Sequence, residues 1–252
     1  MNAARILPGV VAVLLFFAGW QAYCAMSGIS PLLLPSPVQV LRAFIDILGE
    51  APTWVHLAFT LGETLAGFAI ALVFGIALGW VIATFPMLER AIHPFVVASQ
   101  IVPKVALVPL FVLWFGFGPT SKIVVAAVIA FFPVMTNTLL GLRSVEAGHE
   151  DVFGALRANA WQRFRMLQLP SALPAIMAGT EMAMVLATIG AVVGEYLGGS
   201  DGLGYFAVAT MNAFQTDRLF GIIILLTVMG FLLYAAVAWL RRALLPWHRS
   251  VG

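Results

Sequence analysis

The chain has 252 residues, of which 62% are hydrophobic and only 10% are charged, with a formal net charge of +2. Soluble domains carry about 25% charged residues. The mean hydropathy of +1.02 excludes a disordered chain and argues against an ordinary cytosolic enzyme. Because the apolar residues occur in long blocks, we expect lipid to surround most of the chain.

Several classes of function are disfavoured by the few polar side chains. No basic run is interleaved with aromatic residues, which argues against nucleic-acid binding. The single cysteine, Cys24, excludes an internal disulfide, and four scattered histidines argue against a metal site. The sequence has no GxxxxGK[ST] phosphate loop and no set of residues typical of a catalytic triad, so we do not expect an enzyme.

Six segments are predicted to cross a membrane, which takes about 20 mostly apolar residues each. Four are uninterrupted, at 6–26, 64–86 with a start near Trp54, 123–142 and 219–240. Two are interrupted, because 91–117 contains Lys104 with two prolines and 171–194 contains Glu181 with one proline. The sequence therefore predicts an all-α, polytopic membrane protein with six transmembrane helices.

The first segment also has features of a signal peptide, with Arg5 before an apolar run and small residues after it. We favour a retained anchor, because the rest of the chain is membrane-embedded. Prolines then interrupt the chain up to residue 37, and apolar residues return at helical spacing, at Val40, Leu41, Phe44, Ile45 and Leu48. This pattern predicts a short amphipathic helix on the outer surface.

Small residues recur every four positions in the second span, at Gly67, Ala71, Gly75 and Gly79. A similar row runs along the fifth span, at Gly179, Ala183, Ala187 and Ala191. Such rows let helices approach closely in lipid. They indicate packing within the chain, or else a row that lines a dimer seam or a pore.

Ionisable residues inside spans are costly and therefore candidates for function. Lys104 and Glu181 are expected at similar depths, and we predict that they face the bundle interior, either as an ion pair or along a transport route. Glu195 is expected at the outer end of the fifth span, before a glycine-rich loop at 198–204. It is a candidate for an outer gate or a partner contact, or else a helix-end carboxylate beside a flexible connector.

The longest inner connection, 143–171, has an apolar stripe typical of an amphipathic helix, at Phe153, Leu156, Ala160, Phe164 and Leu167. Leu169, Pro170 and Pro174 are expected to end this helix. It could lie among lipid headgroups, cap its own bundle, or insert into a groove of a soluble partner.

Residues 151–174 resemble the signature loop of ABC importer permeases, a Glu-Ala-Ala and glycine motif followed by Leu-Pro. Further segments resemble the nitrate, sulfonate, taurine and thiamine-precursor or riboflavin branch, at 34–37, 103–110, 114–118, 131–133 and 190–195. The chain departs from the motif where Asp151, Val152 and Phe153 replace Glu-Ala-Ala. Arg157 replaces the usual glycine, so we expect a more continuous helix than in the family.

The resemblance implies the fold of an ABC type I importer permease. It also implies a second permease copy, a cytoplasmic ATPase that carries the ATP, and an extracytoplasmic solute-binding protein, with no cofactor on the chain itself. The implied ATPase-coupling residues are Asp151, Phe153, Gly154, Leu156, Arg157, Ala158, Ala160, Trp161, Phe164, Leu169 and Pro170. The implied solute is like a sulfonate, nitrate or taurine, or like a thiamine precursor or riboflavin.

This interpretation divides the chain into an N-terminal helix with its outer segment at 1–53, a transport core at 54–242 and a cytoplasmic tail at 243–252. With the N-terminus inside, nine of the 13 basic residues are cytoplasmic, at positions 5, 90, 143, 157, 163, 165, 241, 242 and 249. We therefore expect both termini on the cytoplasmic side of a bacterial inner membrane, with Arg42, Lys122 and Arg218 in outer loops. An ion-coupled secondary transporter and a membrane scaffold without a solute remain the alternatives.

Overall fold

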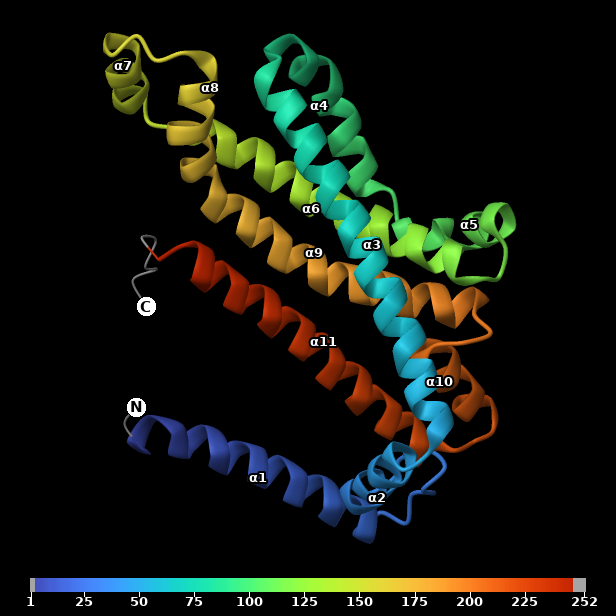
Figure 1. The fold of residues 1–252 in the computed structure, drawn as a ribbon. Helices are drawn as coiled ribbons and strands as arrows, with labels where there is room; N and C mark the ends of the chain where they lie inside the picture. The colour runs from blue at the N-terminus through green and yellow to red at the C-terminus, as the bar shows by residue number, and fades with distance from the viewer. Residues whose placement is uncertain (1–2, 247–252) are drawn as a thin grey trace.

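The computed structural model describes residues 3–246, and within them every regular element is a helix (Figure 1). The α-helices are α1 (Ala3–Met26), α2 (Pro37–Leu48), α3 (Ala51–Thr84), α4 (Pro86–Ile101), α5 (Val108–Phe115), α6 (Pro119–Arg143), α7 (Ala147–Ala155), α8 (Ala160–Arg163), α9 (Leu169–Gly198), α10 (Leu203–Asn212) and α11 (Thr216–Leu244). A 3₁₀ segment, Lys104–Leu107, precedes α5, and a π-helical segment, Phe164–Gln168, joins α8 to α9. The end of the predicted tail, 247–252 with Arg249, lies outside the described residues.

Five helical segments are long and apolar enough to cross a membrane, and a sixth span is reached when α4 and α5 are taken together. These two helices meet at an angle of 84°. The bend lies at Val102 and Pro103, which are extended, because proline lacks an N–H and disfavours helix in the residue before it. The predicted all-α membrane fold is thus confirmed, with the third span broken.

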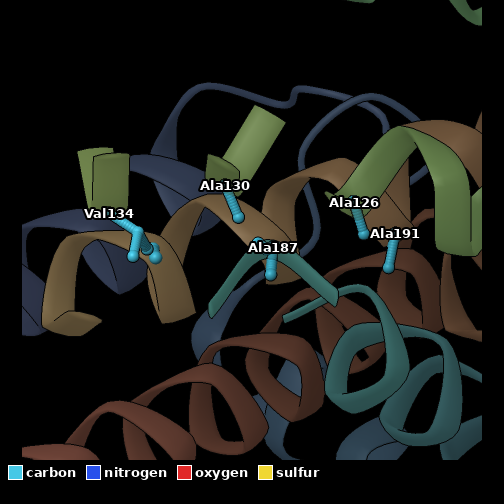
Figure 2. Close-up of a cluster of buried hydrophobic side chains, with 7 residues drawn as sticks. Ala126, Ala130, Val134, Ala187 and Ala191 are labelled. Carbon is cyan, nitrogen blue, oxygen red and sulfur yellow. The ribbon is translucent and has the colours of Figure 1, made fainter. Parts of the chain in front are cut away.

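The centre of the bundle is formed by α3, α6 and α9, which pack through small residues (Figure 2). A Cβ atom added to Gly67 would lie 2.5 Å from the Ala126 Cβ, and one added to Gly75 would lie 2.8 Å from the Val134 Cβ. Both contacts are closer than real Cβ atoms approach, so these positions require glycine. The small residues of α3 therefore pack directly against α6 of the same chain.

The predicted outer helix is α2, which begins at a capping box between Ser36 and Gln39. Its buried residues are Val40, Ala43 and Ile47, whereas Leu41 and Ile45 are exposed. Helix α11 packs against α2, and Phe44 and Leu48 of the predicted apolar set pack there as well, whereas Leu41 and Ile45 face away from the bundle. Ile47 joins a cluster with Leu203, Ala207, Ile222, Leu225 and Met229.

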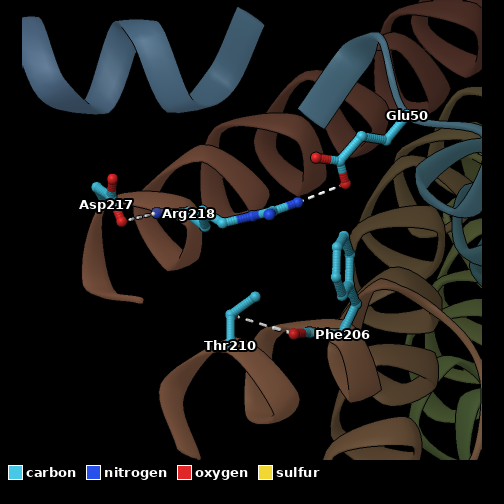
Figure 3. A network of polar contacts seen from close by, with 5 residues as sticks. All are labelled: Glu50, Phe206, Thr210, Asp217 and Arg218. Carbon is cyan, nitrogen blue, oxygen red and sulfur yellow. Dashed lines mark hydrogen bonds and ion pairs between the residues drawn. The ribbon is translucent and has the colours of Figure 1, made fainter. Parts of the chain in front are cut away.

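A polar network connects the N-terminal ends of α3 and α11 (Figure 3). Arg218 forms an ion pair with Glu50, the residue that precedes α3. The Arg218 backbone N–H also donates to the Asp217 carboxylate at 2.9 Å. These contacts hold the start of α11 against the start of α3.

The first helix, α1, contacts other elements near its C-terminal end. The Trp20 ring lies 5.9 Å from the Phe220 ring, centroid to centroid, and the Cys24 thiol lies 3.8 Å from the carbonyl oxygen of Leu34. In Figure 1 the N-terminal end of α1 and the C-terminal end of α11 lie on the same side of the molecule as α7 and α8.

Candidate functional site: an elbow, a cavity and a polar cluster

The predicted coupling region is an elbow between two short helices. Helix α7 ends in a Schellman motif: the N–H of Ala158 donates to the carbonyl of Phe153 and that of Arg157 to the carbonyl of Gly154, each at 3.0 Å. Arg157 has a φ of 50°, in the left-handed region that normally favours glycine. The turn that a glycine usually makes is therefore present with an arginine in its place.

The expectation of a more continuous helix at Arg157 was wrong. The Schellman hydrogen bonds satisfy the last carbonyls of α7, and Asn159 then starts α8 with a capping box to Gln162, both bonds being 2.9 Å. Helix therefore stops on one side of the turn and restarts on the other. The predicted single stripe is divided, so that Leu156 is exposed while Leu167 is buried.

The expected end of the helix at Leu169 and Pro170 was also wrong. Pro170 lies near the start of α9 and Pro174 lies inside it, and the π-helical segment before them connects α8 and α9 without a loop, so neither proline ends the helix. The elbow is therefore attached directly to a spanning helix.

Polar contacts join α7 to the chain that follows it, and large apolar side chains are exposed at the elbow. Glu150 on α7 lies 3.9 Å from the Arg163 guanidinium and accepts a hydrogen bond from Gln168 at 3.5 Å. Leu156 is 73% exposed and Trp161 is 65% exposed. Of the other predicted coupling residues, Asp151, Gly154, Arg157, Ala160 and Leu169 are exposed, and Phe153, Ala158, Phe164 and Pro170 are half-buried.

Lys104 and Glu181 do not pair. The Lys104 ammonium lies 4.8 Å from the centre of the Phe132 ring, while the Glu181 carboxylate binds Arg241 of α11 at 3.1 Å. Of the two alternatives for these residues, the ion pair is therefore wrong, because they face different neighbours. Lys104 lines a cavity whose described lining includes Met182 of α9 and does not include Glu181.

That cavity has a volume of about 330 Å³ and is bounded by the end of α4, by α6 and by α9. Its polar lining includes Gln100, Lys104, Thr136 and Asn137. A volume of this size suits a small organic molecule.

Glu195 is 1% exposed and belongs to a polar cluster where α3, α9 and the start of α10 meet. Its carboxylate accepts a hydrogen bond from the backbone N–H of Gly204 at 2.7 Å. Thr60 and His56 of α3 accept from the N–H groups of Leu203 and Gly202, at 2.8 and 3.1 Å. Three orphan donors at the start of α10 are thereby satisfied by α3 and α9.

Two further charged residues lie within reach of this cluster. Lys122, expected in an outer loop, is buried in the first turn of α6, where its ammonium donates to the carbonyl of Gly118 at 2.9 Å. Glu63 is 4% exposed and close enough to interact with both Lys122 and Glu195. The predicted span began at residue 123, one residue after Lys122, whereas α6 begins at Pro119, so Lys122 was assigned to an outer loop.

In the part of the chain that the structure describes, no group of three or more His, Cys, Asp or Glu side chains is placed to hold a metal ion. His56 accepts a hydrogen bond from the Gly202 N–H, and its ring lies against the rings of Tyr205 and Phe206.

Residues 71–249 match the family described as "binding-protein-dependent transport system inner membrane component". The formylaminopyrimidine transport permease protein of Halalkalibacterium halodurans is 40% identical over 98% of both chains. The riboflavin transport system permease protein of Chloroflexus aurantiacus is 38% identical over 97% of this chain and 90% of that one. The taurine transport system permease protein of Escherichia coli is 32% identical over 96% of this chain and 90% of that one.

A solved inward-facing structure of a methionine ABC transporter aligns with a TM-score of 0.67 at 20% sequence identity. The alignment covers 77% of this chain and 98% of the transporter chain. The likeness confirms the predicted importer permease fold.

Proposed function

Because the chain belongs to the inner-membrane component family of binding-protein-dependent transport systems, we propose that it forms the solute pathway of an importer driven by a separate ATPase. The family consists of transport components, so the chain is a membrane permease and not an enzyme. ATP is bound and hydrolysed on the partner in this proposal, and the chain itself carries no cofactor.

The elbow at Leu156 and Trp161 is the observation that supports an ATPase partner. A short helix pair with exposed apolar side chains, such as Leu156 and Trp161, is suited to insert into an apolar groove on a soluble partner. The Glu150–Arg163 contact braces α7, and the π-helical segment joins α8 directly to α9. A push on the elbow would therefore reach a spanning helix without crossing a flexible loop.

The test is a substitution of Leu156 by Asp in the full chain, followed by co-purification with the ATPase of the same transport system. We expect the L156D chain to lose ATPase association, because a carboxylate would be desolvated in the groove. Phe214→Asp is the matched control, since Phe214 is 73% exposed and precedes α11, on the side away from the elbow. Equal ATPase binding by L156D and wild type would contradict the assignment.

We also propose the remaining partners and the arrangement in the membrane. A second copy of this chain would complete the pathway, and an extracytoplasmic binding protein would deliver the solute near α10. Both termini and the elbow would be cytoplasmic, with 54–242 as the transport core, 1–53 as the N-terminal helix and outer segment, and 243–252 as the tail. Since α2 packs on α11, the outer segment supports that core directly.

The solute is proposed to be a small organic molecule of the kind named for the relatives. The pyrimidine and riboflavin permeases are 40% and 38% identical to this chain, and the taurine permease 32%. Of the three candidate pathway residues, Lys104 lines a cavity, whereas Glu181 and Glu195 are held by Arg241 and by Gly204. We therefore place the route for the solute beside Lys104.

A further inference from the structure

Three ionisable side chains are buried close together, one from each of α3, α6 and α9. Glu63 of α3 is 4% exposed, Lys122 of α6 is 2% exposed and Glu195 of α9 is 1% exposed. The two carboxyl groups lie within hydrogen-bonding reach of each other, and the charge of Lys122 acts on both. Two ionised carboxylates beside one ammonium would leave a net negative charge away from water, which is costly.

One oxygen of each carboxyl group has no hydrogen-bond donor among the described residues. These atoms are Glu63 Oε2 and Glu195 Oε1, whereas Glu195 Oε2 accepts from the backbone N–H of Gly204 at 2.7 Å. The Lys122 ammonium is directed instead at backbone carbonyls, among them that of Gly118 at 2.9 Å. Because buried polar atoms are rarely left without a partner, the two orphan oxygens need an explanation.

We propose that Glu63 and Glu195 form a proton-binding site, in which one proton is shared between a carboxylic acid and a carboxylate. A proton placed between them turns one orphan oxygen into a donor and the other into its acceptor. It also leaves one carboxylate to balance the Lys122 ammonium, so the buried charges sum to zero. The paired carboxyl groups of aspartic proteases hold one proton between them for the same electrostatic reason.

A water molecule or a metal cation fits this position less well than a proton. Gly202 covers the Glu195 carboxyl so closely that a Cβ atom there would clash with Oε1, which leaves little room for a bridging water. A cation would meet the like charge of Lys122. It would also find only two carboxyl groups, whereas hard cations take six or more oxygen ligands.

The other ionisable groups nearby do not replace the proton. Asp201, in the loop before α10, adds a further negative charge near Glu63, which a proton would offset. His56 of α3 accepts from the N–H of Gly202 through Nδ1, so it has no proton to donate from that atom. Helix α5, which packs on α6 and α9, carries no ionisable side chain.

The shared proton would join three helices. Glu63 belongs to α3 and Glu195 to α9, and the N–H of Gly204 that Glu195 binds lies at the start of α10. Removing the proton would place two negative charges side by side, which separates α3 from α9 and weakens the support of α10. The stability of this region is therefore expected to fall as the pH rises.

The test is infrared spectroscopy of the full chain at neutral pH, where exposed carboxyl groups are ionised, in a detergent that has no carbonyl group. We expect the wild type to show the C=O stretching band of a protonated carboxyl group. Glu63→Gln and Glu195→Gln should each lose this band. Glu89→Gln is the matched control and should keep it, because Glu89 is ion-paired with Arg143 and therefore ionised.

The melting temperature is a second readout. That of the wild type should fall when the pH is raised from neutral to alkaline, as the shared proton is lost. In E63Q the fall should be smaller, because the glutamine amide keeps an N–H donor toward Glu195 at every pH. In E89Q the fall should be as large as in the wild type.

Absence of the band from the wild type would overturn the proposal, because both carboxyl groups would then be ionised. This result needs no variant, so it stands even where a substitution prevents folding. A band that remains in both E63Q and E195Q would also overturn the proposal, since the proton would then belong to another carboxyl group. The importer function is decided separately, by ATPase association of L156D.

Discussion

The Arg241 guanidinium of α11 donates a hydrogen bond to the Glu181 carboxylate of α9, with 3.1 Å between Nη1 and Oε2. The Glu181 side chain is 10% exposed and that of Arg241 is 38% exposed, so the contact is partly shielded from water. A carboxylate within a spanning helix is costly without a partner. This pair therefore ties the middle of α9 to the last turn of α11.

Removing Arg241 should destabilise the chain. Arg241→Met leaves Glu181 without its partner and should lower the free energy of unfolding by about 1–2 kcal/mol. Arg242→Met is the control, because Arg242 is exposed and forms no ion pair with the described residues. Thermal unfolding in detergent measures both, and a double variant with Glu181→Gln should lose less than the sum of the single losses. Equal melting of R241M and R242M would refute the coupling.

The left-handed Arg157 should gain from a glycine. Arg157→Gly removes a steric cost of about 1 kcal/mol at a φ of 50°. Because the Schellman bonds of Ala158 and Arg157 then open less often, their amide hydrogens should exchange more slowly. Arg165→Gly is the contrast, since it places glycine within the π-helical segment and should speed exchange there. Faster exchange in R157G would show that the arginine side chain stabilises the turn.

Thr60 should be needed to hold α10. Thr60→Val leaves the buried N–H of Leu203 unpaired, at a cost of about 1–3 kcal/mol. Thr227→Val is matched in shape and removes only a hydrogen bond to the carbonyl of Ile223 within its own exposed helix face. Hydrogen exchange at Leu203 should rise strongly in T60V and remain unchanged in T227V. Equal protection in the two variants would mean that α3 does not hold α10.

Two glycines of α3 should respond in opposite directions to the same substitution. Gly75→Ala forces a Cβ against Val134 and should lower stability by about 1–3 kcal/mol. Gly62→Ala meets nothing within 4 Å and should raise stability by about 0.5–1 kcal/mol, because alanine favours helix. Thermal unfolding of the two variants compares them directly, and a stabilised G75A would contradict close packing of α3 on α6.

Much of the fold could be predicted because a long apolar segment in lipid is stable as a transmembrane helix, in which every backbone polar group is bonded internally. The spans were found on that ground, and the elbow was located by its resemblance to a known loop. The row at Gly67 and Gly75 permitted several interpretations, because spacing shows that a helix neighbour comes close without showing which helix it is. Contacts with Ala126 and Val134 show that the neighbour is α6.

The errors have a common physical cause. Glu181 pairs with Arg241, 60 positions away in the chain, and a spacing argument within one helix does not reach such a partner. The turn at Arg157 depends on hydrogen bonds from Ala158 and Arg157 back into α7, which override the residue's own preference against left-handed backbone. Local composition carries little information about either.

The attachment of α1 near its C-terminal end, through Trp20 and Cys24, also has a consequence for its response to bilayer thickness. From Leu7 to Met26 none of its side chains is buried within the chain, so in a bilayer most of its length would be open to lipid. A rod tethered at one end takes the tilt that matches its apolar length to the thickness of the hydrocarbon layer. Thinning the bilayer should therefore swing the inner half of α1 while α3, α6 and α9 keep their mutual packing.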